Sequence, residues 1–233
     1  MDMKEKQKVA IFDIDGTIFR SSLLIELVEA LLIEGLFPED ARAEFLAEEN
    51  LWLDRKDSYE EYIMAVVQVF VKHIKGMHYG ELVEASNAVF EKHKDRVYVY
   101  TRDLVKDLKK QGYFLLAISQ SPKTTIDPFA KYLGFDKVYG RGYEIGPNDQ
   151  FTGEVMDINL IENKANIVKR AVEKSGLTLE GSIAVGDTEG DISMLEMVEN
   201  PIAFNPNKSL YRYAKRAGWK VVVERKDVVY EIE

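Results

Sequence analysis

The stretch KVAIFDIDGTIF, from Lys8 to Phe19, contains the features that decide the fold. Its apolar residues Val9 to Phe12 lie between a charged segment and the turn sequence Asp15-Gly16, which predicts a buried strand that ends abruptly. Asp13 and Asp15 stand two residues apart, so strand geometry points both carboxylates the same way. Two converging like charges beside apolar sequence are costly unless a cation such as Mg²⁺ neutralises them. Taken alone, the same residues also fit an ordinary Asp- and Gly-containing turn.

Length and composition define the broad class of protein. The chain has 233 residues, enough for one large domain or for a domain that carries a smaller inserted one. A formal net charge of −9 disfavours nucleic acid and anionic membranes as partners, and the absence of cysteine excludes disulfides and Cys-based zinc sites. The charged start MDMKEKQK does not resemble a signal peptide, and no apolar run is long enough to span a bilayer. We therefore expect a soluble, cytoplasmic protein, while the oligomeric state stays open.

Residues 21–95 carry only helical patterns. Leucine and valine recur at helical spacing after Ser21 and Ser22, which offer N-caps, and Gly35 closes this first helix. Further helices are predicted from Pro38 to about Asn50, over about 59–74, and from about Tyr79 to Lys94. A run of helices of this length predicts a small bundle. We interpret residues 21–95 as a helical cap inserted into a core formed by residues 1–20 and 96–233.

From Val97 onward, strand and helix patterns alternate. Short apolar segments separated by amphipathic helices and Gly-containing turns predict a parallel sheet with helices on both faces. The expected fold class is therefore α/β, with a doubly wound, Rossmann-like sheet and functional groups at the carboxyl ends of its strands. The predicted strands are YFLLAI at 113–118, KVYG at 137–140, YEIG at 143–146, FTGEV at 151–155, SIAV at 182–185, PIAF at 201–204 and WKVVVE at 219–224; the predicted helices cover about 101–111, 122–134, 160–174, 191–198 and 208–217.

Polar side chains follow three of these strands, at the point where each strand ends. If the three strands are neighbours, four carboxylates meet at one edge of the sheet. Each residue also has an ordinary structural explanation, as a turn residue or a helix cap. The residues are Asp13 and Asp15 after the first strand, Ser119, Gln120 and Ser121 after the strand 113–118, and Asp187 and Asp191 after the strand 182–185.

Lys164 supplies the opposite charge. Asn159 and Glu162 predict a helix that begins just before it, so the lysine is expected near a helix N-terminus. A cation there opposes the helix dipole, and presenting lysine and helix terminus to one anionic ligand is a physical reason to accept that cost. A solvated surface lysine is the competing interpretation.

Together these motifs resemble the haloacid dehalogenase superfamily, in its phosphatase branch. The resemblance rests on DIDGT at 13–17, the apolar strand ending in Ser119, Lys164, and GDTEGD at 186–191, in the family's order. The segments ISQSP, FTG at 151–153 and AFNPN at 203–207 are similar to the phosphoserine-phosphatase-like group, and residues 21–95 match the position of that group's helical cap.

The resemblance implies a Mg²⁺-dependent phosphomonoester hydrolase acting on a small soluble phosphorylated metabolite. It makes Asp13 the nucleophile that forms an aspartyl-phosphate and Asp15 the general acid, then base. The metal would be bound by Asp13, Asp187 and the Asp15 backbone carbonyl, with Asp191 in support through water or Lys164. The phosphoryl-binding residues implied or expected beside them are Ser119, Lys164, Gln120 and Thr17.

The chain departs from phosphoserine phosphatases where those enzymes recognise serine. Their glutamate nine residues after the nucleophile is Ser22 here, and YEEYIMAVVQVF in the expected cap lacks their arginine, for which Arg42 or Arg55 could substitute. Gly190 stands where they have Asn. We therefore predict a leaving group other than phosphoserine's. The cap residues Trp52, Tyr59, Tyr62, His73 and His78 are interpreted as packing or surface groups rather than ligands.

Two alternatives stay open. A phosphotransferase or mutase on the same fold would use the same motifs, and diversion of phosphate to an added alcohol would reveal it. A non-catalytic phosphate-binding protein has little need of Asp13 and Asp15 together, and binding of a phosphate analogue without turnover would favour it. A dehalogenase fits less well, because Asp15, Lys164 and the late aspartates suit phosphate and metal.

Overall fold

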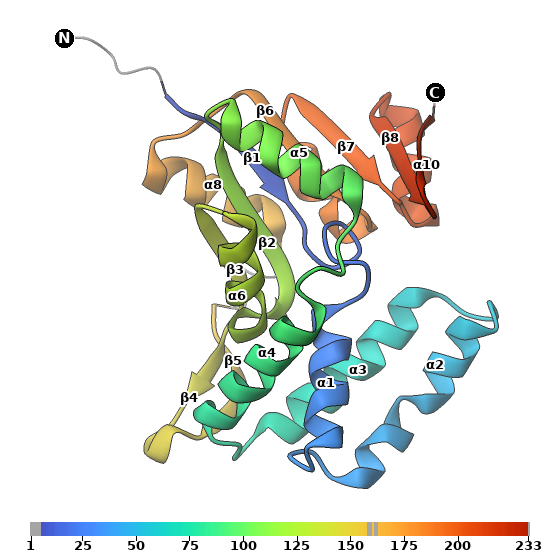
Figure 1. The fold of residues 1–233 in the computed structure, drawn as a ribbon, viewed down its shortest axis with the longest axis vertical. Coiled ribbons are helices and arrows are strands. Elements are labelled where there is room, and N and C mark those ends of the chain that lie inside the picture. Colours follow the sequence, from blue (N-terminus) through green and yellow to red (C-terminus); the bar gives the residue numbers. More distant parts are fainter. Residues whose placement is uncertain (1–5, 158–159, 161–162, 233) are drawn as a thin grey trace.

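A seven-stranded sheet forms the centre of the computed structural model, which describes residues 6–157, 160 and 163–232 (Figure 1). The strand order is β3-β2-β1-β6-β7-β8-β9, parallel except for the antiparallel edge strand β9. In the centre, Ala10 pairs with Leu115 of β2 and with Ile183 of β6. The strands are β1 (Lys8–Phe12), β2 (Phe114–Pro122), β3 (Lys137–Arg141), β6 (Thr178–Gly186), β7 (Asn200–Phe204), β8 (Lys220–Arg225) and β9 (Val228–Ile232).

Helices cover both faces of the sheet, as the alternating pattern predicts. Along β1, Val9 and Ile11 point to one face and Ala10 and Phe12 to the other, and each pair joins a separate apolar core. One face packs against α5 (Val99–Lys110) and α6 (Lys123–Leu133), the other against α8 (Lys164–Ser175), α9 (Ile192–Leu195) and α10 (Lys208–Ala217). The predicted doubly wound α/β fold is therefore confirmed.

The segment after β1 forms a helical bundle at one end of the molecule (Figure 1). Its elements are α1 (Leu23–Ile33), a 3₁₀ turn (Glu39–Glu44), α2 (Leu46–Leu53), α3 (Tyr59–Ile74) and α4 (Tyr79–His93). The single helix predicted from Pro38 to Asn50 is in fact two elements, because Phe45 leaves helical geometry at φ −129° and buries its ring. Across the boundary with the sheet domain, the buried hydroxyls of Ser86 on α4 and Thr125 on α6 lie 3.0 Å apart.

A small hairpin from the second half of the chain lies against this bundle. It consists of β4 (Tyr143–Ile145), a short 3₁₀ turn (Pro147–Asp149) and β5 (Phe151–Val155). Phe151 N–H donates to Met77 O at 2.9 Å, and the rings of Phe70 and Tyr143 meet edge to face at 5.3 Å. Residues from beyond position 96 thus contribute to the packing of the bundle, and the boundaries 21–95 stay a prediction.

Several elements of the second half differ from the predicted ones. Strand β2 continues to Pro122, so Ser119, Gln120 and Ser121 belong to its last residues and do not follow it, and β6 begins at Thr178. The helix expected at 191–198 is a 3₁₀ turn (Glu189–Asp191) followed by the single turn α9. Helix α8 begins at Lys164 with Asn163 as its cap, whereas the expected start at Asn159 and Glu162 lies outside the described residues. Strand β9 has no counterpart among the predicted strands. It follows a turn in which Lys226 adopts a positive φ of 58°, a conformation that Gly or Asn usually occupies in hairpin turns.

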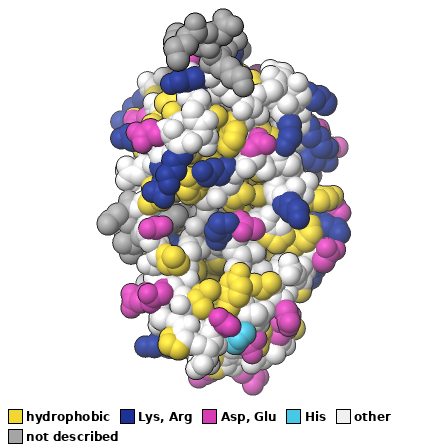
Figure 2. Space-filling model, turned by 90° about the vertical axis from the view of Figure 1, so that its left-hand side faces the viewer, with side chains coloured by type: hydrophobic (Ala, Val, Ile, Leu, Met, Phe, Trp, Pro, Cys, Tyr) yellow, Lys and Arg dark blue, Asp and Glu magenta, His cyan; other side chains and the backbone are white. Residues whose placement is uncertain are grey.

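Charge is distributed unevenly between the two parts of the chain. Residues 21–95 contain sixteen acidic and seven basic side chains, so the whole formal net charge of −9 resides there and the rest of the chain is balanced. On the face drawn in Figure 2, Lys and Arg are most frequent in the upper half and Asp and Glu in the lower part. Within the described residues, no helix is long and apolar enough to cross a membrane.

Candidate active site

The carboxyl ends of three adjacent strands bring the predicted site residues together. Because the sheet order places β1 between β2 and β6, the residues at and just beyond the carboxyl ends of these strands share one edge. Asp13 is fixed there by its backbone, whose N–H donates to Val185 O of β6 at 3.0 Å. The conditional prediction that these strands are neighbours is therefore confirmed.

Lys164 lies at the bottom of this edge and is only 5% exposed. Its Nζ is 2.6 Å from Asp13 Oδ1 and 2.5 Å from Asp191 Oδ1, and 3.4 Å from the carbonyl of Ile118. The lysine is the first residue of α8, and the Asn163 side chain caps that helix by accepting from Ala165 N–H. The surface-lysine interpretation is wrong, because the ammonium is a buried counter-ion shared by two carboxylates.

Asp191 is held from both sides. While Oδ1 contacts Lys164, Oδ2 accepts hydrogen bonds from the N–H groups of Asp187 and Thr188 at 2.9 and 3.1 Å. Asp191 occupies the N-cap position of α9, but its side chain does not cap that helix. At Gly186, a Cβ would lie 2.5 Å from Asp191 Cγ, so only glycine allows this close packing.

Asp15 faces a different set of donors. Leu23 N–H, in the first turn of α1, donates to its Oδ1 at 2.6 Å, and Ser119 Oγ donates to its Oδ2 at 2.6 Å. Ser119 Oγ in turn accepts from Ser121 N–H at 2.9 Å. Ser22 occupies the predicted N-cap position of α1 but makes no capping hydrogen bond, and a side chain eight residues from Leu23 accepts from the helix instead.

Three carboxylates converge as a metal site would require. Oxygens of Asp13, Asp187 and Asp191 lie within 4.8 Å of one another, and Asp13 Oδ2 is buried without a hydrogen-bond partner among the described residues. Gly16, at φ +78°, allows the approach of Asp187, whose Oδ2 would lie 2.1 Å from a Cβ at this position. An unsatisfied carboxylate oxygen in an all-oxygen donor set fits a hard divalent cation. The Asp15 carboxylate is outside this group.

The pKa values at the site reflect an excess of buried negative charge. Burial raises the pKa of Asp13 to about 7, against the opposing attraction of Lys164. Burial also raises the pKa of Asp15, and that of Asp187 well above its usual value, where Asp13 and Asp191 add repulsion. Burial disfavours the Lys164 charge, but its two carboxylate neighbours raise its pKa overall. A divalent cation would relieve this repulsion.

Thr17 and Gln120, predicted to bind phosphate, lie at the same edge in different settings. Thr17 is buried and its hydroxyl donates to Asp187 Oδ1 at 3.3 Å. Gln120 is exposed, lines the cavity above Asp13, and its Oε1 accepts from Arg141 at 2.8 Å. Their contact with phosphate, like the roles assigned to Ser119 and Lys164, stays a prediction.

A cavity of about 410 Å³ lies over these groups, between the sheet edge and helix α3. Tyr59 and Arg141 reach this cavity, although sequence reasoning assigned Tyr59 to packing and gave Arg141 no role. Burial raises the pKa of Tyr59, with Asp15 and Asp187 close enough to add to the shift and Ser22 in hydrogen-bonding contact. The lining is completed by Asp13, Asp15, Ser22, Leu24, Glu60, Ile63, Met64, Val67, Gln120, Ser121, Lys164, Asp187, Thr188, Glu189 and Gly190.

The other aromatic and basic cap residues have structural roles, as expected for packing or surface groups. Trp52 packs edge to face on Tyr59, and Arg55 Cζ lies over the Trp52 ring, 4.5 Å from its centroid. His73 lies 2.9 Å from Glu44 Oε1, and His78 caps α4. Tyr62 lies 3.4 Å from Glu49, and Arg42 pairs with Glu29 and Glu49. Neither Arg42 nor Arg55 lines the cavity.

Comparison with known proteins gives consistent matches. The family model for haloacid dehalogenase-like hydrolases matches residues 10–196. The chain is 28% identical to a phosphoserine phosphatase of Archaeoglobus fulgidus over 206 residues, which cover 88% of this chain and 54% of that protein. It is 24% identical to a histidinol-phosphatase of Neisseria meningitidis over 229 residues, with 93% and 98% covered.

A solved structure has the same fold. A phospho-aspartyl intermediate analogue of phosphoserine phosphatase is 23% identical to this chain and covers 96% of each chain at a TM-score of 0.62. The family match includes most of β1 from residue 10, the carboxyl end of β2 and the loop after β6, which are the segments that build the site. The chain therefore belongs to the haloacid dehalogenase-like hydrolase family.

Proposed function

We propose that this protein is a Mg²⁺-dependent phosphomonoester hydrolase that works through an aspartyl-phosphate on Asp13. The observation that carries the proposal is the Lys164 ammonium held between Asp13 and Asp191 beneath the cavity, with Asp13 Oδ2 buried and unpartnered among the described residues. A carboxylate oriented by one oxygen, with the other free of donors, suits nucleophilic attack. The phosphatase names among the relatives agree with this chemistry.

In the first step, an oxygen of Asp13 attacks phosphorus while the bond from phosphorus to the leaving oxygen breaks. Asp15 donates a proton to that oxygen, and the pKa of Asp15, raised by burial, favours the protonated form that this requires. In the second step, Asp15 takes a proton from water as the water oxygen attacks phosphorus, which frees Asp13 and inorganic phosphate. The two carboxylates keep separate roles because their hydrogen-bond partners are separate.

Asp13, Asp187 and the Asp15 backbone carbonyl would hold the Mg²⁺, with Asp191 in support. The ion supplies positive charge that offsets repulsion between a carboxylate nucleophile and a phosphate dianion. Lys164, which contacts Asp13 Oδ1 at 2.6 Å, adds a second positive charge beside the nucleophile. Ser119, Gln120 and Thr17 lie at the same edge, and we assign them to orienting phosphoryl oxygens.

The proposed substrate is a small phosphorylated metabolite other than phosphoserine. A cavity of about 410 Å³ suits a small ester. Ser22, where serine-specific enzymes carry an acid, presents a buried hydroxyl beside Tyr59. Arg42 and Arg55 are occupied elsewhere on the bundle, so neither replaces the missing arginine of α3.

The test is phosphate release from a panel of amino-acid, sugar, nucleotide, amino-alcohol and aryl phosphates, with Mg²⁺ and with EDTA. Asp13→Asn is expected to lower kcat by roughly 1,000-fold or more, because the neutral amide is a poor nucleophile. Asp103→Asn is the matched control, since Asp103 pairs with Arg102 outside the cavity. Activity that survives Asp13→Asn or EDTA would contradict the mechanism, and phosphoserine as the best substrate would contradict the specificity. Product analysis with added alcohol separates hydrolysis from phosphotransfer.

A further inference from the structure

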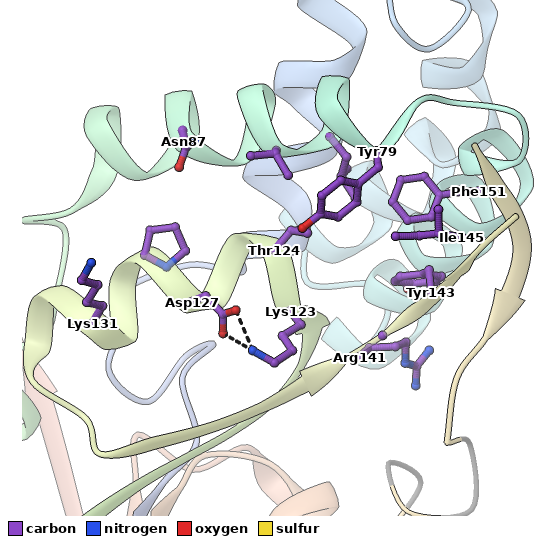
Figure 3. A pocket seen from close by; sticks show the side chains of 14 residues that line it. Tyr79, Asn87, Lys123, Thr124, Asp127, Lys131, Arg141, Tyr143, Ile145 and Phe151 are labelled. Carbon is purple, nitrogen blue, oxygen red and sulfur yellow. Dashed lines mark hydrogen bonds and ion pairs between the residues drawn. The ribbon is translucent and has the colours of Figure 1, made fainter. Parts of the chain in front are cut away.

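Arg141 brings a positive charge into the cavity at a place that no feature of the chemistry above explains. It is the last residue of β3, and it lines the same cavity as Asp13, Asp15 and Lys164. It also borders a second cavity of about 640 Å³ between α4 and α6, but its guanidinium points out of that groove, away from Asp127 and Lys131 (Figure 3). The charge is therefore directed away from the groove.

The position of Arg141 is fixed by close packing of its strand. At the preceding Gly140, a Cβ would lie 2.6 Å from Ile126 Cδ1 and 2.9 Å from Lys123 Cα, so β3 approaches α6 as closely as glycine permits. Rigid backbone on this side sets where the arginine side chain begins. This fixed backbone and the hydrogen bond from the guanidinium to Gln120 together restrict the arginine side chain, which lowers the conformational entropy lost when it binds a ligand.

The Arg141 charge is not neutralised by the described part of the chain. Its guanidinium donates to Gln120 Oε1 at 2.8 Å and forms no ion pair with a described carboxylate, while its buried Nε has no described hydrogen-bond partner. Burial raises the pKa of Tyr143 to about 12, against the opposing charge and hydrogen bond of Arg141. Its hydrogen-bond partners in the described part of the chain, Gln120 and Tyr143, are neutral side chains, which orient the charge without cancelling it. A half-buried guanidinium in this state favours an anionic partner.

The strand order places that partner on one side of the nucleophile. Arg141 ends β3, two strands from β1 on one side, whereas Glu189 follows β6 on the other side. Glu60 on α3 and Glu189 line the same cavity, and burial together with the charge of Glu189 raises the pKa of Glu60. An anion bound in the cavity is therefore attracted toward β3 and repelled from the side of β6.

We infer that Arg141 binds an anionic group on the leaving alcohol, a carboxylate or a second phosphate, and so sets the substrate class. The inference rests on the proposed function, because it assigns specificity to the same cavity. Lys164 and the acidic groups already serve the transferred phosphoryl group. A separate cation at the wall of the cavity is available for the rest of the substrate.

The experiment compares three classes of phosphomonoester on the wild type, Arg141→Gln and Arg141→Lys. Phosphoglycolate and a sugar bisphosphate are the two anionic probes, glycerol phosphate and an aryl phosphate are neutral, and phosphoethanolamine is cationic. Arg141→Gln should lower kcat/KM roughly 10- to 100-fold for the preferred anionic probe and less than about threefold for the neutral ones. Arg141→Lys should fall between, and the ranking of the two anionic probes identifies the group bound.

Lys131→Gln is the matched control, since it removes the same charge from a residue that lines only the second cavity. An equal loss on all esters in Arg141→Gln would overturn the inference and assign Arg141 to the phosphoryl group. A wild type that prefers neutral or cationic esters would overturn it as well.

A binding measurement separates failure of this inference from failure of the proposed hydrolysis. Calorimetry in the Asp13→Asn background measures the affinity for the intact anionic esters without turnover. The further change Arg141→Gln should weaken that affinity by the same 10- to 100-fold. Unchanged affinity contradicts the role of Arg141 whether or not the wild type hydrolyses any ester, whereas absent turnover with arginine-dependent binding contradicts the hydrolase alone.

Discussion

The sheet edge and the face of α3 form opposite walls of one cavity, and they are built in contrasting ways. At the sheet edge, Lys164, Asp191 and Asp15 are each fixed by two or more hydrogen bonds or ion pairs. Across the cavity, α3 presents the apolar side chains of Ile63, Met64 and Val67 beside Tyr59 and Glu60. The sheet edge holds charged groups in one geometry. On α3, the apolar side chains that face the cavity could be exchanged for others of similar size. Under the proposals above, the sheet edge carries the chemistry, and selectivity is shared between α3 and Arg141 at the end of β3.

The largest expected effect is on the sheet edge and concerns stability. Lys164→Met should lower the free energy of unfolding by roughly 3–5 kcal/mol, because two buried carboxylates lose their shared counter-ion. Urea unfolding at neutral pH without metal measures this. Lys123→Met removes an exposed ion pair with Asp127 and should cost less than about 1 kcal/mol. A similar loss of unfolding free energy in the two variants would show that the sheet-edge network does not stabilise the fold more than an exposed ion pair does.

The next effect concerns catalytic geometry at Gly16. Gly16→Ala would place a Cβ 2.1 Å from Asp187 Oδ2, so kcat/KM for an aryl phosphate should fall by roughly 100-fold or more as that carboxylate moves. Gly35→Ala is a control for backbone strain alone, because Gly35 has a similar φ of +69° and nothing within 4 Å of its Cβ position. Equal activity in the two variants would mean that Asp187 can move without consequence.

The smallest effect is expected on the opposite wall. Tyr59→Phe removes a hydroxyl beside Ser22 while keeping the ring against Trp52. For some esters of the panel, kcat/KM should change by about three- to tenfold, by an amount that depends on the leaving group. For the aryl phosphate, kcat/KM should stay nearly constant. The panel described above measures this, with Tyr79→Phe, outside this cavity, as the control. A uniform loss across the panel would give Tyr59 a part in the chemistry and remove the contrast between the walls.

The same contrast decides what could be predicted from the sequence. Residues such as Asp13 and Ser119 were found because strand ends carry a local signal and parallel strands share an edge. Tyr59 could not be distinguished from core aromatics, since an apolar helical stripe looks the same whether it faces a core or a cavity. Arg141 lies one residue beyond the predicted strand 137–140, and its direction depends on the packing of Gly140 against α6. Sequence spacing contains no information on that packing.

The fold follows the same rule. Elements with strong local patterns, such as α10 at Lys208–Ala217, have the predicted bounds. The hairpin β4–β5 was predicted as strands, but its position against Phe70 and Met77 depends on contacts between distant segments. Strand β9 was missed because its turn contains a lysine in left-handed conformation instead of a glycine.

The hydrogen bond from Leu23 N–H to Asp15 Oδ1 links the proposed general acid to α1, the first helix of the bundle. A donor favours the ionised carboxylate, so moving α1 away makes Asp15 hold its proton more tightly. Thermodynamic reciprocity requires the converse, that protonating Asp15 loosens the attachment of α1 by the same free energy. Under the proposed mechanism, each change in the protonation of Asp15 therefore changes how strongly α1 is attached. The position of α1 and the pKa of Asp15 are therefore thermodynamically coupled.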